Sequence, residues 1–280
     1  MSRITQEDFK NRAKGALWGL VVGDCLGSPI QFYEKDNHPF ITEMVPCEIF
    51  RTPSGYWTDD ASMAFCIIES YIRLKNYDLE DIASNFVNWY NNGFMSSMPY
   101  AFDVGGATEY AIKCIEKKSM ENGNEQTQGN GSIMRFAPSY FIFQKEKEKN
   151  IIFDISDLTH NSAVVRNVVL KLSDTISEHL QGVRTSNKSR YSNREEVDNS
   201  GWAVSTMEAA LWAFENSFDF ESGMIKAVNL GGDSDTIGAV FGQIAGAYYG
   251  FSNIPKRWVS GVKDYKKIDK FLDDFLELVL

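Results

Sequence analysis

The sequence predicts an all-α protein that forms one compact domain over residues 1–280. Few stretches alternate apolar and polar residues with the period of two that a strand requires, whereas many show the three- and four-residue spacing of a buried helix face. With 43% hydrophobic and 13% aromatic residues, the chain can bury a sizeable core. We expect loops between the helices to supply a shared functional site.

Two glycine ladders indicate the helices at the centre of this fold. Glycines recur every fourth residue at 15, 19, 23 and 27, where we expect a helix over 7–23, and at 238, 242, 246 and 250, where we expect one over 235–249. Positions four apart share a helix face, so each ladder provides a smooth strip that another backbone can approach closely. The sequence leaves open whether the two strips face each other or pack against different neighbours.

The remaining elements follow from capping residues and apolar spacing. We expect one helix over 60–75 and another from the cap at Asp78 to the stop at Gly93. Residues 151–180 are expected to form two helices with a break near His160. Further helices are expected over 107–118, 202–216, 220–229 and 266–279. Residues 30–57 contain three prolines and are predicted to form a long ordered loop, a feature that is often functional. The polar segment 182–200 is expected to be the most mobile part of the chain.

Composition excludes several classes of partner. The net charge of −10 argues against nucleic acids and anionic membranes, which select basic surfaces. There is no run of about 18 apolar residues and no signal-peptide pattern, so a reduced cytoplasmic location and a monomer are the expectations. The four cysteines include no Cys-x-x-Cys pair, which makes a zinc site improbable.

Two acidic segments are the strongest candidates for chemistry. Thr58–Asp60 and Asp233–Thr236 each combine two aspartates with a threonine, and each precedes an expected helix. If the two segments meet, four carboxylates would repel one another unless divalent cations lie between them. Oxygen ligands suit magnesium, manganese or calcium, and the presence of only three histidines argues against a histidine-rich metal site. Ordinary helix capping explains the same residue types, so the pattern leaves both interpretations open.

Six short motifs, in a fixed order, indicate a family. They are Gly23–Gly27, Thr58–Asp60 followed by Met63, Phe102–Gly105, Gly129–Arg135, Thr159–His160, and Gly231–Thr236 with its Gly/Ala-rich helix and Tyr248–Gly250. Each is weak alone, but together they are specific. The chain resembles the ADP-ribosylglycohydrolase superfamily over nearly its whole length, and especially the bacterial branch typified by the dinitrogenase reductase-activating glycohydrolase.

The resemblance implies a two-metal hydrolase that cleaves the bond between ADP-ribose and a protein side chain or small acceptor. Two Mg²⁺ ions, or Mn²⁺, would be held by the residues that match the family's ligands. Asp103, in the motif that carries the proton-handling carboxylate of the bacterial branch, would be catalytic together with Asp60 and Asp233, although a turn aspartate is the simpler interpretation of Asp103 alone. The implied ligands are Thr58, Asp59, Asp60, Asp233, Asp235 and Thr236.

The same resemblance implies a substrate-binding set. Gly129, Asn130, Gly131, Ser132 and Met134 match the loop that lines the ADP-ribose pocket, and His160 matches a position near the substrate. Gln31 and Glu34 complete the expected substrate-binding set. A flexible turn and an interior histidine are the alternatives. Arg135 is expected to be either a phosphate contact or part of a structural ion pair.

Four positions depart from the family pattern or compete for one role. Gln31 stands where much of the family has a glutamate, and Ala61 replaces the usual threonine after the Asp-Asp pair. Glu34 follows a Phe-Tyr pair, as does the key glutamate of another branch, so Gln31, Glu34 and Asp103 compete for the proton-handling role.

We therefore expect a metal-dependent hydrolase that releases ADP-ribose from modified proteins, with arginine as the leading acceptor. Other conjugates, such as O-acetyl-ADP-ribose or ADP-ribosylserine, are the enzymatic alternatives. A non-catalytic ADP-ribose-binding or structural relative is the third, and Gln31 and Ala61 keep it open.

Overall fold

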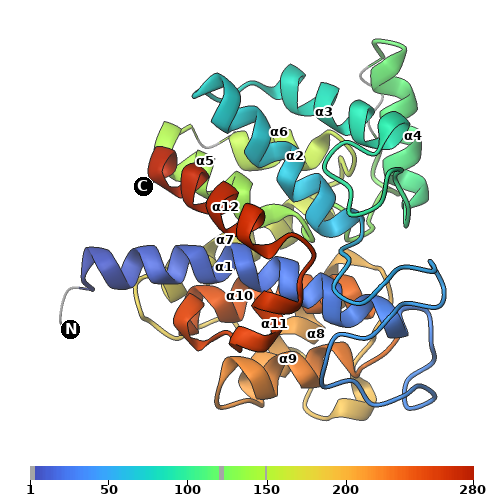
Figure 1. Cartoon of the computed structure of the whole chain (residues 1–280), viewed down its shortest axis with the longest axis vertical. Coiled ribbons are helices and arrows are strands. Elements are labelled where there is room, and N and C mark those ends of the chain that lie inside the picture. Colours follow the sequence, from blue (N-terminus) through green and yellow to red (C-terminus); the bar gives the residue numbers. More distant parts are fainter. Residues whose placement is uncertain (1–3, 120–122, 149) are drawn as a thin grey trace.

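The computed structural model describes residues 4–119, 123–148 and 150–280, which fold as a helical domain (Figure 1). These residues include no strand, and their only β-type pairings are two isolated bridges, Cys47–Thr52 and Gly129–Trp202. The all-α prediction is confirmed. The α-helices are α1 Gln6–Gly27, α2 Asp59–Leu74, α3 Leu79–Asn92, α4 Gly106–Glu116, α5 Phe136–Glu146, α6 Ile151–Asp157, α7 Ala163–Leu180, α8 Ala203–Glu215, α9 Phe220–Val228, α10 Ser234–Tyr249, α11 Lys256–Gly261 and α12 Tyr265–Val279.

Helices α1 and α10 pack directly against each other through their glycine ladders. A Cβ atom added at Gly19 would lie 2.0 Å from the carbonyl oxygen of Gly242, and one added at Gly242 would lie 1.9 Å from that of Gly19. Gly15 and Gly23 meet the backbones of Gly246 and Gly238 in the same way. Of the two arrangements left open, direct pairing is therefore the correct one, and no side chain separates the two backbones.

Helix α1 continues beyond the end expected near Gly23. It runs through Asp24 to Gly27, where an added Cβ would lie 2.3 Å from the carbonyl oxygen of Ser234. Contact with α10 thus holds the last turn in helical form despite the low helix propensity of glycine. The extension places the buried side chain of Asp24 beside the acidic segments.

The other helices surround this central pair. In Figure 1, α2, α3 and α4 lie above α1, whereas α8 and α9 lie below it. Asp78 caps α3 by accepting from the Asp81 amide, and Gly93 ends it in the left-handed conformation, as expected. Helices α5 and α11 were not predicted: α5 is apolar on most of its faces and gives no clear stripe, and α11 is only one to two turns long. None of the described helices is both long and apolar enough to cross a membrane.

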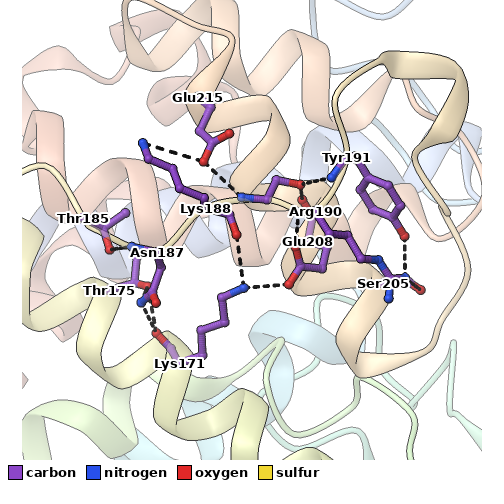
Figure 2. Close-up of polar contacts among 11 residues, drawn as sticks. Lys171, Thr175, Thr185, Asn187, Lys188, Arg190, Tyr191, Ser205, Glu208 and Glu215 are labelled. Atoms are coloured by element: carbon purple, nitrogen blue, oxygen red, sulfur yellow. Dashed lines mark hydrogen bonds and ion pairs between the residues drawn. The ribbon is translucent and has the colours of Figure 1, made fainter.

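The polar segment 182–200, expected to be mobile, is anchored to α7 and α8 by hydrogen bonds (Figure 2). Asn187 Nδ2 donates to Thr175 Oγ1 at 2.9 Å, and the Arg190 amide donates to Glu208 Oε2 at 2.7 Å. Glu208 also pairs with Lys171 at 2.6 Å. The polarity of this segment therefore reflects its bonding to neighbouring helices, and the segment leads directly into the bridge between Trp202 and Gly129.

Candidate active site

The two acidic segments meet at the N-terminal ends of two helices. Thr58 is the N-cap of α2 and Asp233 is the N-cap of α10. Thr236 Oγ1 lies 3.4 Å from Asp60 Oδ1, although the two residues are 176 positions apart. Buried helix N-termini favour negative charge through the helix dipole and free amides, which partly compensates the clustered carboxylates.

Asp24 is a fifth carboxylate beside the two acidic segments, and no role was predicted for it. It is fully buried, and its carboxylate accepts from the Thr58 amide at 2.9 and 3.1 Å and from the Ala61 amide at 3.0 Å. The side chain of Thr58, the N-cap residue of α2, makes no capping bond of its own. Asp24 on α1 takes over this role by accepting from two amides at the start of α2. Asp24 thus positions the backbone that carries Thr58, Asp59 and Asp60.

Burial and mutual repulsion perturb the carboxyl groups. The pKa values of Asp59, Asp60 and Asp235 lie well above the ordinary value, first because the groups are desolvated and then because other carboxylates are close. Burial also raises the pKa of Asp233, while the side-chain amide of Asn130 opposes the rise by donating to Asp233 Oδ2 at 2.6 Å. The cluster therefore lacks enough positive charge of its own.

The chemistry of these oxygens suits a hard cation. Buried oxygens without a hydrogen-bond partner include Thr58 Oγ1, Asp60 Oδ2 and Asp235 Oδ2, which belong to the ligand set implied by the resemblance. Such orphaned acceptors are costly unless a cation or donor satisfies them. No three His, Cys, Asp or Glu residues in the described part of the chain are grouped so that they could hold one ion between them. By ligand type alone, oxygens with negative charge, the two acidic segments suit magnesium or manganese.

Asp103 is held beside this cluster by Gln31. Gln31 Nε2 donates to Asp103 Oδ1 at 3.1 Å, and Asp103 Oδ2 is buried without a partner. Burial raises the pKa of Asp103 to about 6, within the range useful for proton transfer. Glu34, the third competitor for the proton-handling role, is exposed and does not line the pocket.

The glycine-rich loop packs on the ring of His160. A Cβ atom added at Gly131 would lie 2.6 Å from His160 Cε1, so only glycine fits there. Ser132 is turned away from the pocket and accepts from Ser156 Oγ at 2.9 Å, whereas Asn130 and Met134 line the pocket.

Arg135 is buried outside the pocket lining and bonds to this loop. It forms no ion pair among the described residues, and the phosphate contact stays a prediction. Its buried guanidinium donates to the Gly131 carbonyl and to Thr159 Oγ1, the latter at 2.7 Å. Thr159 Oγ1 also lies 2.8 Å from His160 Nδ1, so this hydroxyl joins the two side chains. Burial lowers the pKa of His160 to about 3, so the ring is neutral.

A pocket of about 340 Å³ connects these groups. Its predicted members are Gln31, Asp59, Asp103, Gly129, Asn130, Gly131, Met134, His160, Asp233 and Thr236. Phe32, Thr108 and Gly201 also line the pocket, although they were not among the predicted site residues. Gly201 reaches the pocket because its carbonyl accepts from the Asn130 amide at 3.0 Å, a pairing that no local pattern could reveal.

Comparison with known proteins decides the family. A family model described as ADP-ribosylglycohydrolase matches residues 5–280. The chain belongs to the ADP-ribosylglycohydrolase family. It is an enzyme of the glycohydrolase class, as the names of its relatives also indicate.

Relatives from several branches of the family align over nearly the whole chain. The ADP-ribosylarginine hydrolase Tri1 of Pseudomonas putida (strain GB-1) is 32% identical over 98% of this chain and 80% of its own length. The ADP-ribosyl-[dinitrogen reductase] glycohydrolase of Rhodospirillum rubrum is 28% identical, with 98% and 99% coverage. A solved structure titled "ADP-ribosylglycohydrolase-related protein complex" superposes with a TM-score of 0.81 at 29% identity, covering 98% of this chain and 100% of that one. The glycohydrolase fold expected from the motifs is thus confirmed.

Proposed function

We propose that this glycohydrolase uses two divalent cations, Mg²⁺ or Mn²⁺, to release ADP-ribose from ADP-ribosylated arginine. The observation that carries the proposal is one pocket lined by Asp59 of the first acidic segment, by Asp233 and Thr236 of the second, and by the separate carboxylate Asp103. Two relatives that are 32% and 33% identical are named ADP-ribosylarginine hydrolases, which favours arginine as the acceptor.

The metal ligands in this proposal are Thr58, Asp59, Asp60, Asp233, Asp235 and Thr236. Cations bound there would orient the ribose hydroxyls and lower the pKa of a bound water. Asn130 would keep Asp233 oriented through their 2.6 Å hydrogen bond, and Asp24 would hold the start of α2 in register. Asp60 and Asp233 would contribute to catalysis by holding the ions beside the reacting centre.

Asp103 is the proposed proton-handling group. Cleavage of the glycosidic bond builds positive character on the anomeric carbon, and water must lose a proton as the amine-type leaving group gains one. Asp103 lies in the pocket with one oxygen held by Gln31 and the other without a partner. Gln31 has no titratable proton, so it orients Asp103 and does not replace it.

The part of the pocket formed by the glycine-rich loop would hold the ADP moiety. The Gly129–Gly131 backbone leaves room for close approach, and the neutral His160 ring, in the tautomer protonated at Nε2, would present a proton donor. Phosphate oxygens accept from such donors without requiring a titratable cation. This division places the ribose between the metal ligands and Asp103.

A panel of conjugates tests the acceptor. We expect the protein with Mg²⁺ to release ADP-ribose from ADP-ribosylarginine faster than from ADP-ribosylserine or O-acetyl-ADP-ribose. Faster turnover of either other conjugate would reassign the acceptor, and binding of ADP-ribose without turnover of any conjugate would contradict the proposed catalysis.

A further inference from the structure

Phe32 stands at the mouth of the pocket as an exposed aromatic side chain. It lines the pocket next to Gln31, yet 65% of its surface is accessible. Its backbone is in the left-handed region, with φ of 66°, which is strained for a residue with a large side chain. Strain of this kind collects at functional sites, so the position calls for a functional explanation.

Two backbone hydrogen bonds hold Phe32 in this conformation. The Phe32 amide donates to the Gly232 carbonyl at 2.7 Å, and the Gly232 amide donates to the Tyr33 carbonyl at 2.8 Å. Gly232 immediately precedes Asp233, so the loop that carries Phe32 is joined to the acidic segment itself. These bonds fix the backbone of Phe32 relative to the acidic segment, and the backbone sets where the ring starts.

Further rings extend this wall toward Asp103. The centroids of Phe32 and Phe50 are 6.4 Å apart, and those of Phe50 and Phe102 are 5.3 Å apart. Phe102 directly precedes Asp103, and Tyr100 lies edge-on to Phe102 at 6.5 Å. The aromatic wall, defined as Phe32, Phe50, Phe102 and Tyr100, thus flanks the pocket on the side of Asp103.

We propose that the face of Phe32 binds the acceptor group of the substrate, and that this group is a planar cation of the guanidinium class. This inference rests on the proposed function. A guanidinium is flat, delocalised and weakly hydrated, so it stacks on an aromatic face better than a hydroxyl or an ester does. The carboxylates Asp59, Asp103 and Asp233 in the same pocket lining favour a cationic acceptor over a neutral one.

Three substitutions at Phe32 test the assignment. Phe32→Ala and Phe32→Leu should raise the KM for ADP-ribosylarginine roughly 2- to 5-fold, the range expected for loss of an exposed cation–π contact, with little change in kcat. Phe32→Trp should keep the wild-type KM. Phe40→Ala is the matched control, because Phe40 is 72% exposed but lines a different pocket with His38. A wild-type KM in Phe32→Leu, or an equal rise for ADP-ribosylserine, would overturn the inference.

A binding measurement separates this inference from the proposed catalysis. Methylguanidinium, which carries the guanidinium alone, is titrated into protein saturated with ADP-ribose, and its binding is followed by NMR. Binding that is lost in Phe32→Leu and retained in Phe40→Ala supports the Phe32 subsite even if turnover of ADP-ribosylarginine is absent. Equal binding to wild type and Phe32→Leu contradicts the subsite even if turnover is rapid.

Discussion

Gln31 donates its side-chain amide to Asp103 at 3.1 Å, across 72 positions of sequence. Much of the family resembled by this chain has a glutamate where Gln31 stands. The hydrogen bond gives the Gln31 amide a role at this position, because it holds the Asp103 carboxylate that faces the pocket. Replacement by a carboxylate would instead place two acids side by side.

Gln31→Glu should move the acidic limb of the pH–rate profile to higher pH. A second carboxylate beside Asp103 disfavours ionisation of the pair, so the base form appears only at higher pH. The measurement is kcat/KM from pH 5 to 9, with Gln31→Met as the uncharged control of similar size. An unshifted profile together with faster turnover would show that position 31 is itself the catalytic position.

Asp103→Asn should leave binding of ADP-ribose close to wild type while turnover falls about 100- to 10,000-fold, the usual contribution of a general acid–base. The amide keeps the shape of the side chain but cannot carry the proton. Calorimetric titration with ADP-ribose and a turnover assay give the two readouts. Normal turnover would exclude Asp103 from the proton-handling role.

Asp60→Asn should stabilise the metal-free protein at pH 8 and leave it nearly unchanged at pH 4. The folded pKa of Asp60 is raised above the unfolded value, so the folded state binds the extra proton and stability falls as the pH rises from about 4. Removing the charge should restore about 0.5–2 kcal/mol at pH 8.

Thermal unfolding with EDTA at both pH values measures the Asp60 effect. His160 and His179 oppose the trend, because their lowered pKa values make the folded state lose stability as the pH falls, but they are present in both proteins and cancel in the difference. Stabilisation of equal size at the two pH values would contradict the electrostatic explanation.

Gly19→Ala should lower the free energy of unfolding by about 1–3 kcal/mol. The new methyl group would lie 2.0 Å from the Gly242 carbonyl oxygen and push α1 away from α10. Gly106→Ala is the matched control, since a Cβ there meets nothing within 4 Å. Denaturant unfolding compares the two variants. Equal stability of both would mean that the helix pair tolerates separation.

The glycine ladders and acidic segments could be predicted because each is a local pattern with a physical meaning. Glycines four apart indicate a smooth helix face, and paired aspartates before a helix indicate either a cap or a cation site. The choice between the two ladder arrangements could not be made, because it depends on which backbone lies opposite Gly19 and Gly23.

The residues that were missed act through distant partners. Asp24 looks like any polar residue near a helix end, and its role appears only when its carboxylate meets the Thr58 amide. Phe32 and Gly201 reach the pocket through backbone hydrogen bonds to Gly232 and Asn130, which leave no trace in local sequence. Arg135 bonds the Gly131 carbonyl and the Thr159 hydroxyl, so it is held in place without the ion pair expected for it.

The most direct test of the central claim is release of ADP-ribose from ADP-ribosylarginine after chelation and stepwise return of Mg²⁺, for wild type and Asp233→Asn. We predict that EDTA abolishes wild-type turnover, that Mg²⁺ restores it, and that Asp233→Asn stays inactive although it is folded. Turnover that survives EDTA, or that is normal in Asp233→Asn, would contradict a metal centre formed by the two acidic segments.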